Sequence, residues 1–388
     1  MFILTFFMAL FSLLWNSTCY WIKDEEISEY IDQFHNDEKN RQTLIVKRNV
    51  AMHHSRLPSS PFITGDGFRD VCKYICDETN DCNEINKVMA SKDLFVNNSC
   101  IFIQASRLND FVKNKLKFIR STNNPQKRYT IVTHNNDDSA PDEDTVNVSG
   151  HTSLARVVTS NVLEDEFKHG RLVGIYSQNL WWRDNKILPR KSFMHCLPIG
   201  IENRYNKIGR HPTVYIDAMK YYSRNRQALI IKREQNPLLL VSFTEDYPDR
   251  KKAKYFIKQT SHKSWYTHVT HKMTHKEWLT SIMEHKFVLA PFGHGLDTHR
   301  IAEILLMGGV PVMRKSTINS CYDDSDNLRS DGTSRGRLPI VILESWMNIT
   351  KERLESEWSR LVATKERWDI NRLKLSSALA TIDCHRGS

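Results

Sequence analysis

The sequence predicts an α/β protein whose two domains each contain a parallel sheet and face each other across a cleft. Short apolar runs alternate with amphipathic stretches along most of the chain, which is the pattern of strands and helices in an α/β layer. The 388 residues are enough for two domains of ordinary size. The apolar runs also form two sets, which a basic and polar connection at residues 203–211 separates.

The first element is an apolar run at residues 2–15, FILTFFMALFSLLW, which is typical of the core of a signal peptide. It is too short to span a bilayer by itself, and its extension to residue 22 has the marginal length of a signal anchor. Residues 1–22 are therefore expected to be a cleaved signal or a retained type II anchor. Either one places the rest of the chain in the lumen of the endoplasmic reticulum or Golgi. Residues 23–60, which are charged and poorly patterned, are expected to form a stem or an early helix.

Two further features agree with a secretory compartment. Sequons for N-linked glycosylation occur at Asn97, Asn147 and Asn348. The chain has 8 cysteines, of which four are clustered, and in an oxidising lumen this clustering predicts two local disulfides. The candidates are Cys72, Cys76, Cys82 and Cys100.

Residues 61–204 are expected to form the N-terminal α/β domain. Its apolar runs predict strands, and the amphipathic stretches between them predict helices. The expected strands are 100–103, 129–133, 172–176 and 193–197, and the expected helices include 106–118 and 153–166.

Residues 205–347 are expected to form the C-terminal α/β domain, and residues 348–388 a group of closing helices. The same two patterns define its elements. The expected strands are 238–243, 287–290, 310–313 and 340–343, and the expected helices are 276–284, 298–307 and 351–362.

The most informative segment is KFVLAPFGHGLDTHRIAEILLMGGVPVM, residues 286–313. Its apolar start ends at Pro291 and predicts a buried strand, which a glycine-containing loop, a helix and a second strand follow. In such a parallel crossover, ligands bind beyond the carboxyl end of the strand, near the N-terminus of the helix. Loop amides and Arg300 suit a diphosphate, and Glu303 suits the vicinal hydroxyls of a ribose. The alternative is that Arg300 and Glu303 form only a surface pair on the helix.

Together with LPIVILESW at residues 338–346, this segment resembles the C-terminal half of exostosin-type glycosyltransferases and related GT-B enzymes (family 47-like), which have two Rossmann-like domains. Residues 129–138 and 194–204 are more loosely similar to segments of the N-terminal domain of such proteins. The resemblance implies transfer of a hexosyl or pentosyl group from a nucleotide-sugar donor, expected to be UDP-linked, to a glycan or glycoprotein acceptor. The C-terminal domain would hold the donor, and the N-terminal domain the acceptor. The donor-binding candidates are Gly293, Gly295, Asp297, Arg300 and Glu303.

A transferase of this kind needs a group that removes the proton of the acceptor hydroxyl. His134 and Asp137 directly follow the expected strand 129–133, at the end that would face the cleft. They are the catalytic candidates, with Asp137 as the base. The alternative is that Asp137 belongs to a solvated acidic loop at residues 137–144.

The sequence predicts no essential metal and no cofactor apart from the donor substrate. The D-x-D tripeptides at 142–144 and 324–326 resemble the metal-binding tripeptide of GT-A enzymes, but neither follows a clear strand. The net charge of +10 suggests an anionic partner, and no nucleic-acid-binding motif is present. The alternative function is a secreted, non-catalytic glycoprotein that binds acidic glycans through a basic stretch. That stretch contains Arg250, Lys251, Lys252 and Lys254.

Overall fold

The structure of the chain is a computed structural model. It describes residues 22–48, 59–77, 82–83, 85–87, 98–104, 107–116, 128–134, 161–179, 193–202, 212–260, 263–293, 295–316, 318–322 and 338–382. Apart from its last residue, the expected signal or anchor at residues 1–22 lies outside these ranges, as do Asn97, Asp137 and Asn147. Among the described residues, no helix combines the length and the apolar character that a membrane span requires.

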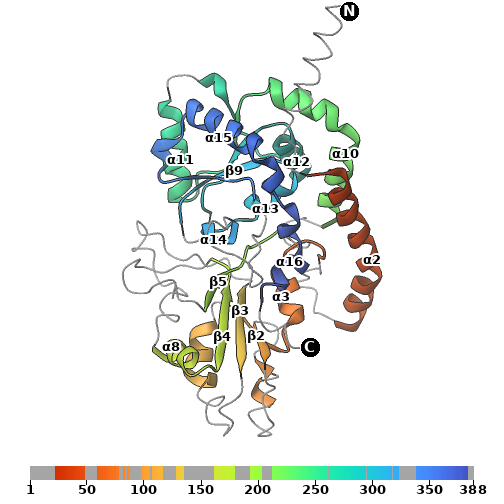
Figure 1. Cartoon of the computed structure of the whole chain (residues 1–388), viewed down its shortest axis with the longest axis vertical. Helices are drawn as coiled ribbons and strands as arrows, with labels where there is room; N and C mark the ends of the chain where they lie inside the picture. Colours follow the sequence, from red (N-terminus) through yellow and green to blue (C-terminus); the bar gives the residue numbers. More distant parts are fainter. Residues whose placement is uncertain are drawn as a thin grey trace, which may run out of the picture.

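The described part of the N-terminal domain contains a sheet of five parallel strands in the order β1-β2-β3-β4-β5, in the lower half of Figure 1. Side chains alternate between the two faces of a strand. Ile101 and Ile103 of β2 pack with α5, η3 and α8 on one face, whereas Phe102 packs with α3 and with α16 (Leu375–Leu379) on the other. The elements of this domain are β1 (Tyr74–Cys76), β2 (Ser99–Gln104), β3 (Tyr129–His134), β4 (Leu172–Ser177), β5 (Met194–Cys196), α3 (Gly65–Val71), α5 (Leu108–Asp110), the π-helix η3 (Phe111–Lys115) and α8 (Asn161–Lys168).

The described part of the C-terminal domain contains a second sheet of five parallel strands, in the order β10-β9-β8-β6-β7. Leu240 and Val288 pack with α10, α12 and α13 on one face, and Leu239 and Phe287 pack with α11 and α15 on the other. Its strands are β6 (Leu239–Val241), β7 (Tyr266–His268), β8 (Phe287–Leu289), β9 (Val310–Arg314) and β10 (Val341–Leu343). Its helices are α10 (Pro212–Gln235), α11 (Pro248–Gln259), α12 (His275–Met283), α13 (His299–Leu306), α14 (Asn319–Tyr322) and α15 (Lys351–Ala363).

These two sheets confirm the predicted fold class of two parallel α/β layers. In the second sheet the strand order reverses between β6 and β8. From β6 the chain moves outward to β7 at one edge and then returns to β8 on the other side of β6. Such a reversal is a topological switch point, where the loops at the carboxyl ends of the two strands diverge.

The expected stem, residues 23–60, contains α2 (Asp24–Arg48), which packs along α10 (Figure 1). The ring of Tyr30 lies 5.6 Å from that of Phe62, which in turn lies 5.8 Å from the ring of Tyr215 on α10. The N-terminal part of α2 is therefore packed against the body of the protein.

The C-terminal residues return to the N-terminal domain through short 3₁₀ helices. The backbone N–H of Leu375 donates to the carbonyl of Pro61 over 2.7 Å, and α16 packs against α3 (Figure 1). Ala378 and Ile382 are buried in the core of that domain. The segments concerned are η7 (Lys365–Arg367), η8 (Ile370–Leu373) and α16 (Leu375–Leu379).

The four clustered cysteines form two disulfides, as predicted, and pair as Cys72–Cys100 and Cys76–Cys82. A third disulfide, between Cys196 and Cys321, joins β5 to α14 and so crosses between the domains. Asn348, the sequon that the structure describes, is exposed at the end of η6 (Trp346–Asn348).

Candidate active site

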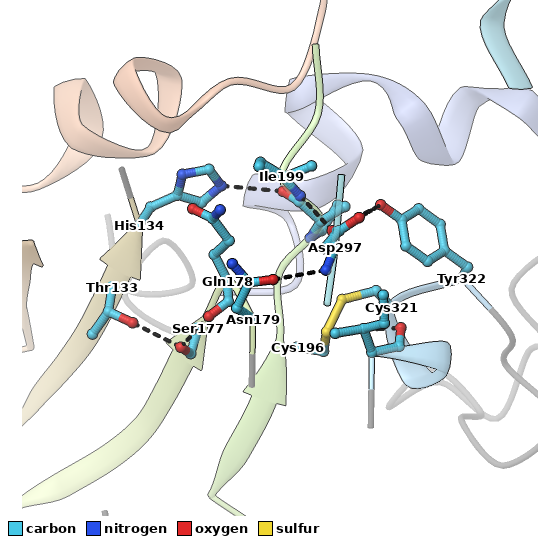
Figure 2. Close-up of a disulfide and its surroundings, with 12 residues drawn as sticks. Thr133, His134, Ser177, Gln178, Asn179, Cys196, Ile199, Asp297, Cys321 and Tyr322 are labelled. Atoms are coloured by element: carbon cyan, nitrogen blue, oxygen red, sulfur yellow. Dashed lines mark hydrogen bonds between the residues drawn. A yellow bond between two sulfur atoms is a disulfide. The ribbon is translucent and has the colours of Figure 1, made fainter. Parts of the chain in front are cut away.

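The carboxyl ends of the two sheets point toward each other. Asn179, two residues past β4, contacts the loop that follows β8, and Cys196 at the end of β5 is bonded to α14 (Figure 2). We call residues 290–298, which join β8 to α13, the glycine loop. Because ligands of α/β sheets bind at the carboxyl ends of the strands, a functional site is expected where this loop meets the N-terminal domain.

Asp297, in the glycine loop, joins the two domains. Its Oδ2 accepts a hydrogen bond from the backbone N–H of Ile199 at 2.8 Å, and its own N–H donates to Oδ1 of Asn179 at 2.7 Å. The hydroxyl of Tyr322 donates to the carboxylate at 2.8 Å (Figure 2). Only 2% of Asp297 is exposed, and burial raises the pKa of its carboxyl group to about 6. We call Asp297 with Asn179, Ile199 and Tyr322 the Asp297 cluster.

His299, at the start of α13, adds a second contact with the N-terminal domain. Its Nδ1 donates to the carbonyl of Gly200 over 2.9 Å, and its Nε2 lies 3.3 Å from a carboxylate oxygen of Glu202. Burial lowers the pKa of His299, but the hydrogen bond and the negative charge of Glu202 outweigh burial and raise it. The helix that carries the expected donor site is thus fastened to both domains.

Asp249 fastens the other end of the glycine loop, at the switch point between β6 and β8. Its Oδ2 accepts a hydrogen bond from the backbone N–H of Phe292 at 2.9 Å. Its Oδ1 accepts from Nε of Arg314 and from the indole N–H of Trp346, both at 2.9 Å. Since Asp249 opens α11 and Arg314 ends β9, this carboxylate holds together loops from three neighbouring strands.

Arg250, next to Asp249 in the first turn of α11, is a cation inside the switch point. Its Nη1 donates to the hydroxyl of Thr244 over 3.3 Å, and its guanidinium carbon lies 4.9 Å from the centroid of the Tyr247 ring. Burial lowers its pKa, and the nearby acidic side chains oppose that effect only in part. Its Nε is buried, and neither a carboxylate nor any other acceptor of the described residues accepts a hydrogen bond from it.

Gly293 allows this guanidinium to approach the loop closely. A Cβ atom at Gly293 would lie 3.0 Å from Nη2 of Arg250 and 3.2 Å from Cγ2 of Thr298. The hydroxyl oxygen of Thr298, the residue before α13, is also buried without a hydrogen-bond partner in the described part of the chain. The guanidinium of Arg250 and the N-terminal end of α13 therefore lie on either side of one glycine, and both favour an anion such as a phosphate.

Arg300 and Glu303, the donor-binding candidates on α13, face α12. Glu303 is 2% exposed, and its carboxylate accepts from the hydroxyl of Tyr215 at 2.9 Å and from the indole of Trp278 at 2.7 Å. Nε2 of His275 lies 3.2 Å from the same carboxylate. The guanidinium carbon of Arg300 lies 4.2 Å from the centroid of the Trp278 ring. In this structure both side chains belong to a packed cluster, and their contact with a nucleotide stays a prediction.

His134, the described catalytic candidate, ends β3 at the carboxyl edge of the N-terminal sheet (Figure 2). It is 2% exposed, and its ring lies 5.2 Å from that of Phe68. Nε2 lies 3.2 Å from the carbonyl oxygen of Pro198, and because a carbonyl only accepts, this nitrogen is the donor. Asp137 lies three residues further on, outside the described residues, so its role as a base stays a prediction.

Comparisons with known proteins leave the family open. No protein-family model and no curated protein matches the chain. Among solved structures the chain is similar to an α,α-trehalose-phosphate synthase (UDP-forming) from Burkholderia vietnamiensis. The TM-score is 0.34 and the sequence identity 10%, over 79% of this chain and 80% of that chain. A TM-score this low does not establish a shared fold, and membership of the exostosin-type family stays a prediction.

Arg250 was not among the nucleotide-binding candidates of the sequence analysis, which placed it in a basic stretch. Lys251 and Lys252 are indeed exposed, but Arg250 is half-buried. The sequence does indicate that Arg250 lies in a helix directly after a strand. An apolar run at 238–243 is followed by a polar loop and by Pro248, and proline is typical of the first turn of a helix. The adjacency of β6 and β8, which gives Arg250 its position, was not visible there.

Proposed function

We propose that the protein is a glycosyltransferase that transfers a hexosyl or pentosyl group from a nucleotide-sugar donor to a glycan or glycoprotein acceptor. The donor is expected to be UDP-linked, with its diphosphate beside Arg250 and Gly293. The N-terminal domain provides the acceptor side. The N-terminal apolar run, the sequons and the disulfides support a place in the secretory pathway, in the lumen of the Golgi or endoplasmic reticulum.

The half-buried guanidinium of Arg250 is the observation that carries this proposal. A buried N–H donor that lacks an acceptor, as Nε of Arg250 does, costs about 1–3 kcal/mol. Arg233, a buried arginine of the same domain, shows the structural alternative, since it donates to the carbonyls of Met283 and Gly308. At Arg250 a diphosphate would supply both the missing acceptor and the opposite charge.

The arrangement of the two sheets favours group transfer over nucleotide binding alone. A diphosphate at the switch point directs the group attached to it toward the carboxyl ends of the facing sheet, where β4 and β5 end. Two facing domains also exclude water, which would otherwise compete with the acceptor hydroxyl for the sugar. The resemblance of residues 286–313 to exostosin-type enzymes supports a sugar as the group transferred.

Calorimetric titration with UDP and with GDP tests the proposal. Wild type is expected to bind one of them, and Arg250→Ala to bind it at least about tenfold more weakly. A charge-assisted hydrogen bond contributes about 1.5–3 kcal/mol, and 1.4 kcal/mol is one decade of affinity. The matched control is Arg353→Ala, because Arg353 lies on the outer face of α15 with 53% of its side chain exposed. This variant is expected to keep wild-type affinity.

A screen of nucleotide sugars with glycan acceptors then identifies the donor. The alternative is a non-catalytic binder of acidic glycans. It would be favoured if the wild-type protein binds neither nucleotide but is retained by a sulfated polysaccharide. In that case Lys251→Ala and Lys252→Ala would weaken retention, because both side chains are exposed on α11.

A further inference from the structure

Asn179 extends from the N-terminal domain to the glycine loop of the C-terminal domain. Its Oδ1 accepts the backbone N–H of Asp297 at 2.7 Å (Figure 2). Its carboxamide also lies directly against Gly295, where an added Cβ atom would overlap it. Asn179 is 6% exposed and has a φ of 51°, in the left-handed region that asparagine adopts more readily than most residues. Backbone and side chain are therefore both adapted to this contact.

The glycine loop is held at its two ends by different domains. At its start, the N–H of Phe292 is bound by Asp249 of the same domain. Near its end, the N–H of Asp297 is bound by Asn179 of the other domain. Gly293, which lies beside Arg250, belongs to the same loop. The geometry around Arg250 therefore depends on where the N-terminal domain lies.

We propose that Asn179 is a positioning residue for the diphosphate site, which is complete only when the two domains are arranged as they are here. This inference rests on the proposed function. Loss of the Asn179–Asp297 hydrogen bond loosens the glycine loop and weakens its hold on the diphosphate.

The test is the variant Asn179→Gly, since glycine tolerates the φ of 51° and lacks the carboxamide. Titrations use UDP or GDP, whichever the wild type binds, and the matching nucleoside, uridine or guanosine. The nucleoside diphosphate is expected to bind about tenfold more weakly, and the nucleoside to bind as in wild type, because the loop holds phosphates and not the base. Asn98→Gly is the matched control, since Asn98 lies directly before β2 with a φ of 55° and is exposed. It is expected to change neither affinity.

Gly295→Ala is a second test that does not depend on the folding of Asn179→Gly. The added methyl group pushes the loop away from Asn179, so the same selective loss of diphosphate affinity is expected. Unchanged affinity in both variants, or an equal loss for nucleotide and nucleoside, would overturn the inference while the proposed function stands. A wild type that binds neither UDP nor GDP would overturn both.

Discussion

The Asp297 cluster and the switch point around Arg250 lie at opposite ends of one short loop and differ in how far their polar groups are paired. The carboxylate of Asp297 accepts hydrogen bonds from both domains. Nε of Arg250, by contrast, is buried without a partner among the described residues. Buried polar groups are nearly always paired, so a paired cluster is expected to stabilise the fold and an unpaired one to be completed by a ligand. The sequence patterns assigned both ends of the loop to ligand binding.

Asp297→Ala should give the largest effect on stability. The substitution leaves the N–H of Ile199 and the hydroxyl of Tyr322 buried without their acceptor. We expect the free energy of unfolding, measured by denaturant titration, to fall by about 3–5 kcal/mol. The control is Asp217→Ala, because Asp217 is exposed on α10 and its loss should cost less than about 0.5 kcal/mol. A loss below about 1 kcal/mol at Asp297 would show that its cluster does not hold the domains together.

The titration of Asp297 should have a somewhat smaller effect, which appears as a pH dependence of the free energy of unfolding. Burial raises the pKa of Asp297 from its ordinary value of 3.8 to about 6 in the folded protein. The folded state therefore retains a proton that the unfolded state releases, and stability falls as the pH rises from the lower value to the higher one. Between pH 3 and pH 7 wild type should lose about 3 kcal/mol relative to Asp297→Asn, which does not titrate. If the free energy of unfolding changes equally with pH in the two proteins, the pKa assigned to Asp297 is contradicted.

The strands differ in how well the sequence predicts them. β2 and β3 are six residues long and buried throughout, so they form the continuous apolar runs that parallel strands show when both faces are covered. β1 and β7, Tyr74–Cys76 and Tyr266–His268, are as short as β6 and β8, but they do not lie inside a longer apolar run. Lys73 and Asp77 flank β1, and β7 itself contains Thr267 and His268. Those two strands were missed for this reason.

The sequence predicted where the glycine loop lies but not which residues it contacts. The glycine loop follows β8 and precedes α13, as the pattern of residues 286–313 indicated. The partners of Asp297, by contrast, include Ile199 and Asn179, which lie 98 and 118 residues away in the sequence. The role of Arg250 depends on β6 lying next to β8. No periodicity or local motif carries such information, because it arises from the order of strands in the sheet.

Glu303→Gln should give the smallest of these effects. The amide places an NH₂ group among the side-chain donors Tyr215 and Trp278, so the free energy of unfolding should fall by about 1–2 kcal/mol. Thermal denaturation checks this expectation, and an unchanged midpoint would contradict the packed cluster. Titration of the same variant with nucleotide and nucleoside tests the predicted ribose contact. If Glu303 contacts the ribose, the variant should bind both ligands about tenfold more weakly than wild type.

The most direct test of the diphosphate site is a crystal structure of the protein with whichever of UDP and GDP it binds. The account predicts a phosphate oxygen about 3 Å from Nε of Arg250, beside Gly293 and within reach of the hydroxyl of Thr298. A diphosphate bound instead at Arg300, with Nε of Arg250 still lacking an acceptor, would contradict it.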